Sequence, residues 1–180
     1  MKIDAKGIMQ GVRYVPSPNC DDRPTESGIN LLVIHNISLP PNEYGGEGVI
    51  EFFTNCLDPE THPYYQTIHE LKVSAHFFIR RSGEIIQFVP CDKRAWHAGA
   101  SNWCGRERCN DFSIGIELEG SDFEPFTDGQ YDALSALTSA LKEAYPIEGI
   151  VGHSDIAPGR KTDPGPCFDW ERYRGSLVKR

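Results

Sequence analysis

A histidine, a lysine and an aspartate lie within eleven residues near the C-terminal end of the chain, in the segment VGHSDIAPGRKTDPGPCFDW (151–170). Proline and glycine recur through this segment and restrict or redirect its backbone. His153 and Asp163 are residue types that bind zinc, and Lys161 can stabilise a developing negative charge. Because an ordinary surface loop rarely concentrates these types, we interpret the segment as part of a chemical site.

A third possible zinc ligand lies far upstream, where His35 ends an apolar run. Catalytic zinc commonly takes three protein ligands and leaves a fourth position for water. Asp163 precedes Pro164, which favours an extended backbone, and in an extended KTD segment Lys161 points to the same side as Asp163. We therefore predict a zinc site formed by His35, His153 and Asp163 with Lys161 beside it, provided that the two distant histidines converge.

Each of these residues also has an ordinary explanation. A single histidine at a strand end is more often a hydrogen-bonded polar residue than a ligand, and an aspartate before proline is more often a turn former. Lys161, next to Arg160, could be a solvated surface lysine. The spacing leaves these alternatives open, because it does not show whether the residues meet.

The histidines would be positioned by strands of a buried sheet. The run GINLLVIHN (28–36) is continuously apolar, as expected of a strand buried on both faces, and GIVGH (149–153) is typical of a short strand. The segment SAHFFIRRSGEIIQFVP (74–90) predicts two strands joined by a turn. Since His35 and His153 end their strands, they could meet at one edge of the sheet.

The segment FSIGIELE (112–119) alternates in character, which predicts a further strand. One side carries large apolar residues, which we expect to face the core: Phe112, Ile114, Ile116 and Leu118. The other side carries Ser113, Gly115, Glu117 and Glu119. Because the two glutamates share this side, the alternation cannot choose between them as a catalytic carboxylate.

The clearest helix covers TDGQYDALSALTSALKEAY (127–145). Thr127 and Gln130 form a capping-box pattern, large apolar residues recur at helical spacing, and Pro146 ends the helix. With shorter helices near 47–55 and 61–71, the elements predict an α+β fold.

The predicted architecture is a single domain with a central mixed β-sheet flanked by helices. Its length of 180 residues suits one domain with a substantial core. We expect the catalytic core to span 28–170, after an irregular, turn-rich lead-in over 1–27.

Composition excludes several classes of partner. The chain has 18 Lys and Arg against 26 Asp and Glu, a net charge of −8, which argues against nucleic-acid binding. No window approaches the roughly 20 apolar residues that span a bilayer, and the N-terminus lacks an apolar signal region, so we expect a cytoplasmic protein with no membrane partner. Because cytosolic thiols are kept reduced, the six cysteines are expected to be free.

Five segments together resemble one known family: LLVIHN, SAHFFIRRSGEIIQFVP, RAWHAG, GRERCNDFSIGIELEG and GHSDIAPGRKTDPGP. They are similar to the zinc-dependent N-acetylmuramoyl-L-alanine amidases, most closely those of cytoplasmic cell-wall recycling. The resemblance runs from about Gly28 to Trp170. It implies Zn²⁺ as cofactor, held by His35, His153 and Asp163, and a catalytic pair formed by Glu117 and Lys161.

The resemblance also implies a reaction, the hydrolysis of the amide between the lactyl group of 1,6-anhydro-N-acetylmuramic acid and L-alanine in small anhydromuropeptides. In some bacteria, loss of this activity induces a chromosomal β-lactamase. No obligate protein partner is implied. Trp96 could equally be a core residue, and Arg108 could pair with a nearby carboxylate. The expected substrate contacts are Asn36, Tyr64, Trp96, Arg108 and Arg160.

The remaining histidines receive other expectations. His76 is expected to be a buried group that orients a ligand or a backbone carbonyl, and His97 to touch substrate. His62 and His69 are expected to be non-ligands.

Three competing functions remain to be distinguished. A muropeptide-binding module of the same fold would typically lack a metal ligand, whereas all three expected ligands are present. An amidase of intact cell wall would be expected to carry an export signal or wall-binding repeats. A closed structural zinc site needs four protein ligands, and the sequence offers three. We therefore favour the recycling amidase.

Overall fold

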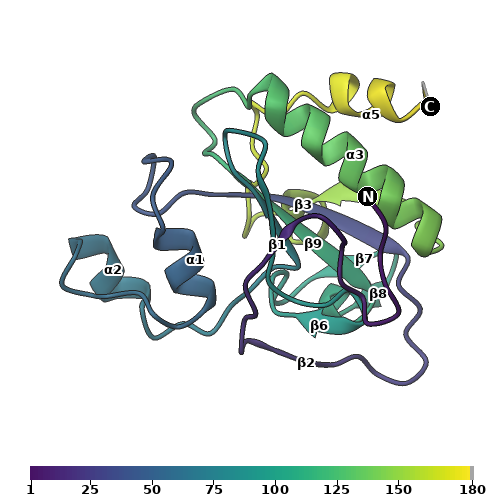
Figure 1. Cartoon of the computed structure of the whole chain (residues 1–180), viewed down its shortest axis with the longest axis horizontal. Coiled ribbons are helices and arrows are strands. Elements are labelled where there is room, and N and C mark those ends of the chain that lie inside the picture. The colour runs from purple at the N-terminus through teal and green to yellow at the C-terminus, as the bar shows by residue number, and fades with distance from the viewer. Residues whose placement is uncertain (179–180) are drawn as a thin grey trace.

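Two parallel strands of seven residues form the centre of the molecule, β3 (Leu31–Ile37) and β9 (Ser113–Glu119). In the computed structural model, which describes residues 1–178, they belong to a six-stranded sheet of order β1-β5-β4-β9-β3-β10 (Figure 1). β10 (Gly149–Gly152) pairs in parallel with β3, and β4 (Phe77–Ile79) pairs in parallel with β9. Only the β4–β5 pair is antiparallel, which makes the sheet mixed.

The predicted strands and the hairpin between β4 and β5 are confirmed, as is the α+β fold. The other short strands are β5 (Ile85–Gln87) and β1 (Arg13–Tyr14) in the main sheet, the pair β2 (Cys20–Asp22) and β6 (Lys93–Ala95), and the pair β7 (Asn102–Trp103) and β8 (Arg106–Glu107). A 3₁₀ turn at Cys109–Asp111 leads into β9.

The helix α3 (Asp128–Ala144) covers one face of the sheet (Figure 1). Its predicted capping box is confirmed: the Thr127 hydroxyl accepts from the Gln130 amide at 3.2 Å, and the Gln130 side chain accepts from the Thr127 amide at 3.1 Å. The apolar side of β9 packs against this helix. Phe112, expected on the same side, lies instead in a separate buried cluster with Leu31 and Val33, because it precedes the strand with a ψ of 10° and the strand alternation does not reach it. The buried contacts include Ile114, Ile116 and Leu118 on the strand and Leu134, Leu137 and Leu141 on the helix.

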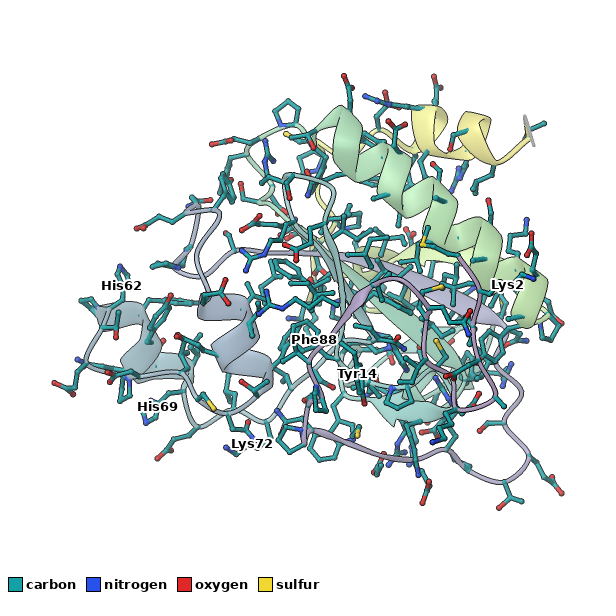
Figure 2. All side chains as sticks on the ribbon, in the orientation of Figure 1. Lys2, Tyr14, His62, His69, Lys72 and Phe88 are labelled. Atoms are coloured by element: carbon teal, nitrogen blue, oxygen red, sulfur yellow. The ribbon has the colours of Figure 1, made fainter. Side chains whose placement is uncertain are left out.

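A smaller lobe lies between β3 and β4 in the sequence and consists of α1 (Gly48–Phe53) and α2 (Pro63–Ile68) (Figure 1). Both helices match the expected segments. Buried aromatic residues of α1, including Phe53, pack against Phe88. Figure 2 shows His62 and His69 on the α2 side of this lobe.

The two ends of the chain contribute more to the fold than expected. The lead-in 1–27 is not wholly irregular, because β1 pairs with β5, β2 pairs with β6, and Met9 is buried in the core. β1 and β2 are only two and three residues long and lie in a turn-rich stretch without an apolar repeat, so no pattern in the sequence indicated them. Beyond residue 170, helix α5 (Trp170–Val178) buries Tyr173 against α3, where its hydroxyl contacts Thr138 at 2.6 Å.

Two further observations bear on the expected environment. Of the helices in the described part of the chain, none has the length and apolar character needed to cross a membrane. The six cysteines all lie within residues 1–178, and each has a free thiol there.

Candidate active site

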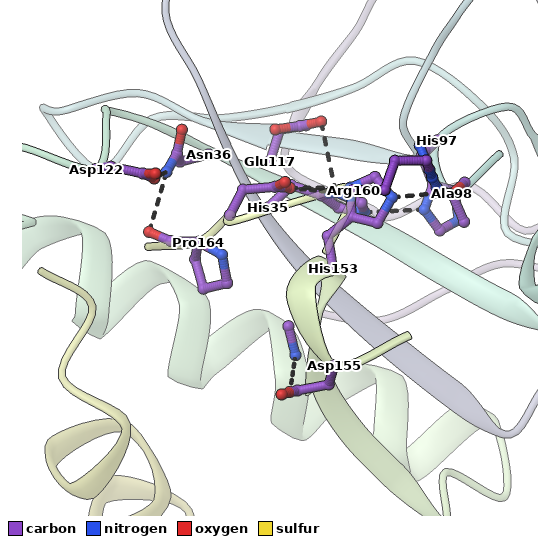
Figure 3. A network of polar contacts seen from close by, with 12 residues as sticks. His35, Asn36, His97, Ala98, Glu117, Asp122, His153, Asp155, Arg160 and Pro164 are labelled. Atoms are coloured by element: carbon purple, nitrogen blue, oxygen red, sulfur yellow. Dashed lines mark hydrogen bonds and ion pairs between the residues drawn. The ribbon is translucent and has the colours of Figure 1, made fainter. Parts of the chain in front are cut away.

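The carboxyl ends of β3 and β10 bring the two distant histidines together. The strands are parallel neighbours with Gly152 opposite Ile34, so His35 and His153 follow at the same level. Neither histidine ends its strand as expected: β3 continues past His35 to Ile37, and His153 is the first residue of the short helix α4 (His153–Ile156), which follows β10 directly. Their Nδ1 atoms are 3.0 Å apart (Figure 3). The convergence that the sequence could only suggest is therefore present.

Asp163 completes this group of three. Its Oδ2 lies 2.9 Å from His35 Nδ1 and 3.0 Å from His153 Nδ1. Among the described residues, these three are the group of His, Cys, Asp or Glu side chains that could hold a metal ion, with ligand atoms within 4.8 Å of one another. The loop bearing Asp163 is tied to the same helical turn as His153, because the amide of Ser154 donates to the Asp163 carbonyl at 3.0 Å.

The protonation of the group is set by its surroundings. Burial opposes ionisation of Asp163, but its polar contacts with His153 and His35 outweigh burial and hold the pKa of its carboxyl well below the usual range. Burial also lowers the pKa of His35 to about 4, against the opposing effect of Asp163. An ionised Asp163 carboxylate therefore faces a neutral His35 imidazole.

The outer nitrogen of His153 identifies its tautomer. Nε2 lies 3.0 Å from the carbonyl oxygen of Ala98, which can only accept a hydrogen bond. Nε2 therefore carries the proton, and the Nδ1 lone pair points toward Asp163 and His35. The Nδ1 lone pairs and the Asp163 oxygen would repel one another at these distances, whereas a bound cation would attract all of them.

Glu117 lies beside this group. It is the cross-strand neighbour of His35, and its Oε1 is 4.0 Å from His35 Nδ1. Its other oxygen is buried and has no hydrogen-bond partner among the described residues. Burial raises the pKa of this carboxyl well above its ordinary value, Asp163 raises it further, and Lys161 opposes the rise.

Glu119, which strand alternation could not distinguish from Glu117, has a different environment. Its two oxygens accept from the backbone amides of Gly45 at 2.6 Å and Arg81 at 2.8 Å. It joins two loops and is fully occupied. The geometry therefore leaves Glu117 as the carboxylate available for chemistry.

These side chains form the floor of a cavity of about 550 Å³. His35, Glu117, His153 and Asp163 line it, and the exposed Lys161 lies at its rim. The α1–α2 lobe supplies an apolar wall that includes Phe52, Ile68, Leu71 and Val73. The cavity therefore joins a polar reaction centre to a surface suited to the carbon skeleton of a ligand.

Residues 25–166 match the family model described as N-acetylmuramoyl-L-alanine amidase. The chain belongs to the N-acetylmuramoyl-L-alanine amidase family. It is 58% identical over 176 residues to the 1,6-anhydro-N-acetylmuramyl-L-alanine amidase AmpD of Escherichia coli K12, an alignment that covers 97% of this chain and 96% of the relative.

Solved structures of this amidase family have the same fold. The crystal structure of a selenomethionine derivative of AmpD is similar with a TM-score of 0.95 and 56% identity, covering 98% of this chain and 99% of that one. The Escherichia coli amidase AmiD, solved with anhydro-N-acetylmuramic acid-L-Ala-D-γ-Glu-L-Lys, is similar with a TM-score of 0.62 and 31% identity, covering 86% of this chain and 60% of that one.

Four of the five expected substrate contacts line the cavity of the amidase: Asn36, Tyr64, Trp96 and Arg160. Arg160 donates to the carbonyls of Ala98 at 2.8 Å and Ala100 at 2.6 Å. The Trp96 indole donates to Asp21 in the N-terminal lead-in at 3.2 Å.

The fifth expected contact, Arg108, does not line this cavity. Its guanidinium lies 3.4 Å from Asp111, and the residue borders a separate surface depression with Glu107. Pairing with a local carboxylate was the alternative that the sequence left open.

Two other histidines of the amidase play parts that the sequence did not fully resolve. His76 is buried, as expected; its Nδ1 accepts from the Gly115 amide at 3.0 Å, and its Nε2 donates to the Lys93 carbonyl at 3.0 Å. His97 lines the cavity, but its Nδ1 lies 2.9 Å from His35 Nε2 and its Nε2 lies 3.1 Å from the Ser113 hydroxyl. Neither ring nitrogen of His97 is left for a substrate, and no spacing in the sequence signals this contact.

Proposed function

We propose that this amidase holds zinc with His35, His153 and Asp163 and hydrolyses the amide between 1,6-anhydro-N-acetylmuramic acid and L-alanine in anhydromuropeptides. The observation that carries the proposal is the convergence of three ligand atoms within 4.8 Å beside the buried Glu117, one oxygen of which has no hydrogen-bond partner among the described residues. The name of the Escherichia coli relative, a 1,6-anhydro-N-acetylmuramyl-L-alanine amidase, supports the choice of bond.

The donor set fits zinc. Two imidazole nitrogens and one carboxylate oxygen are typical ligands of catalytic zinc, and three protein ligands leave one position for water. When bound, zinc lowers the pKa of a coordinated water to about 7 and polarises a carbonyl, so no serine or cysteine nucleophile is needed.

Glu117 acts as general base and then as general acid. Its side chain is adjacent to the metal-binding group, and one oxygen has no competing partner. It can take a proton from the attacking water and deliver it to the nitrogen of the leaving L-alanine. A proton acceptor occupied by backbone amides, as Glu119 is, could not do this without breaking the fold.

Lys161 stabilises the negative charge that develops on the carbonyl oxygen during attack. It lies on the rim of the cavity, two residues before Asp163, and its charge acts on Glu117 and His35. Because that charge develops toward the transition state, Lys161 contributes to turnover more than to substrate binding.

Substrate contacts follow from the groups left free in the cavity. Both N–H groups of the Asn36 amide are occupied, by Asp122 at 2.8 Å and the Pro164 carbonyl at 3.0 Å, so Asn36 offers the substrate only its acceptor oxygen. Tyr64 and Trp96 offer ring surfaces to the sugar, and Arg160 offers positive charge to a peptide carboxylate.

We also propose that the enzyme works in the cytoplasm, where its six thiols would stay reduced.

The test compares purified protein, with and without a zinc chelator, on 1,6-anhydromuramyl tripeptide and on intact sacculi. We expect release of free peptide from the soluble substrate, loss of that release with chelator, and recovery on adding zinc. Intact soluble substrate in the presence of bound zinc would instead support a muropeptide-binding module. Preferential release from sacculi would support an amidase of the assembled cell wall.

A further inference from the structure

His97 stands directly behind one of the three ligands, on the side away from Asp163. Its Nδ1 is 2.9 Å from Nε2 of His35, whereas His35 Nδ1 faces Asp163 and His153 (Figure 3). The two rings meet edge to face, with centroids 5.0 Å apart and an interplanar angle of 85°. The Nδ1 lone pair of His97 can therefore accept a hydrogen bond from the outer nitrogen of His35.

We infer that His97 is a positioning residue that holds His35 in the tautomer and orientation needed to present Nδ1 to zinc. The inference rests on the proposed zinc site. If His97 Nδ1 accepts the hydrogen bond, the proton of neutral His35 must be on Nε2, and Nδ1 is left with a free lone pair. Hydrogen bonds to the outer nitrogen of a metal-binding histidine commonly fix its tautomer in this way.

The polar side of β9 accommodates His97. The hydroxyl of Ser113 lies 3.1 Å from His97 Nε2 and can accept a hydrogen bond from it, which leaves Nδ1 of His97 available as an acceptor. At Gly115 a Cβ atom would lie 2.5–2.7 Å from three atoms of the His97 ring, closer than real Cβ contacts. Ser113 thus binds the ring and Gly115 makes room for it, on the same strand that carries Glu117.

The backbone next to His97 supports the second imidazole. The side-chain oxygen of Asn110 accepts from the amides of His97 at 3.1 Å and Ala98 at 2.8 Å. The Ala98 carbonyl then accepts from His153 Nε2 at 3.0 Å. One anchored dipeptide therefore orients both histidine ligands, through a side chain for His35 and through a carbonyl for His153.

Three substitutions of His97 separate the effect of a hydrogen-bond acceptor at the Nδ1 position from the effect of side-chain volume. In His97→Asn, the side-chain oxygen can occupy the position of Nδ1 and accept from His35. In His97→Gln, the terminal amide reaches the position of Nε2 instead, and His97→Leu fills the space without any acceptor. The three variants therefore separate hydrogen bonding at one atom from filling of the cavity wall.

The experiment measures the zinc dissociation constant of each full-length variant by competition with a chromophoric chelator. It also records the visible absorption of the cobalt(II)-substituted proteins, which reports the ligand geometry without any turnover. We expect His97→Leu and His97→Gln to lose about 10- to 100-fold in zinc affinity and to change the cobalt spectrum. His97→Asn should keep the wild-type affinity and spectrum. His69→Leu, which removes an imidazole from the end of α2, serves as the matched control.

Wild-type zinc affinity and an unchanged cobalt spectrum in His97→Leu and His97→Gln would overturn the inference. The Asn and Gln variants keep the test decisive if the Leu variant does not fold, since they differ only in where the amide lies. Equal losses of zinc affinity in His97→Asn and His97→Gln would also overturn the inference, because the position of the hydrogen-bond acceptor would then not matter. Failure of the proposed function is distinguishable, since wild type and the His69→Leu control would then bind no zinc either.

Discussion

The polar side of β9 ends in two glutamates, two residues apart, whose surroundings are opposite. At Glu117 one carboxylate oxygen lies 4.0 Å from Nδ1 of His35, a proposed metal ligand, and the other has no hydrogen-bond partner among the described residues. At Glu119 both oxygens accept from backbone amides of neighbouring loops. Glu117 therefore keeps an oxygen available for a ligand or substrate, whereas the hydrogen bonds of Glu119 are formed within the fold. Identical residue types can therefore serve chemistry or stability, depending on which donors surround them.

The largest effect on zinc binding and activity is expected when the metal site next to Glu117 loses a ligand. Asp163→Ala removes the only carboxylate of the group and leaves two neutral imidazoles, which would hold a divalent ion loosely. Zinc content after dialysis and hydrolysis of anhydromuramyl tripeptide should both fall to background, while the circular dichroism spectrum stays that of the folded chain. Full zinc occupancy with a normal rate would remove Asp163 from the site.

The next effect separates chemistry from metal binding. Glu117→Gln keeps the shape of the side chain but cannot take a proton, so turnover should fall roughly 100- to 10,000-fold. Zinc content should remain that of the wild type, because Glu117 is not among the ligands. Single-turnover kinetics together with metal analysis would check both points. If Glu119→Gln abolishes turnover in folded, zinc-loaded protein instead, the base has been misassigned.

Lys161→Ala tests the rim of the same region. Loss of a charge that stabilises the developing oxyanion should lower kcat by roughly 100- to 1,000-fold, with a smaller change in KM. Steady-state kinetics on the soluble substrate would show the split. A variant with raised KM and unchanged kcat would mean that Lys161 binds substrate rather than the transition state.

The smallest expected effect is a loss of stability when Glu119 is changed. Glu119→Gln replaces an acceptor that faces a buried amide with a donor, which should lower the free energy of unfolding by ~1–3 kcal/mol. Glu117→Gln should not lower it in zinc-free protein, since that carboxylate is buried without a full set of partners. Urea unfolding of the two variants, side by side without metal, measures the difference. Equal destabilisation would contradict the contrast between the two regions.

The readable parts of the sequence are those with a regular period. β3, β9 and α3 each carry an apolar pattern over five or more positions, so their existence could be predicted, and for β9 and α3 also the side that faces inward. The short strands β1 and β2 have no such repeat, because their pairing depends on partners in the β4–β6 region rather than on their own pattern. The expected boundary at residue 28 consequently left Met9 outside the core.

The candidate site, like the fold, could be predicted from the sequence only in part. The proline-rich segment around Asp163 pointed to chemistry by composition alone, and the resemblance to the amidase family supplied the expected ligands and selected Glu117. Arg108 and His97 show where the sequence was insufficient. Arg108 was expected at the substrate, but it pairs with Asp111, three residues away, and His97 was expected at the substrate, but it contacts His35. Long or planar side chains can reach several partners, and only packing selects one.

The sequence by itself determined the main strands and helices, the residue types of a hydrolytic metal centre and the kind of fold that carries them. Local periodicity and side-chain chemistry suffice for these, because both are properties of short stretches of chain. The tertiary structure decided which side chains meet: parallel pairing of β3 with β10 and β9 places His35 next to both His153 and Glu117, and backbone amides occupy Glu119. Such contacts join residues up to 118 positions apart, and no local pattern encodes a distance between them.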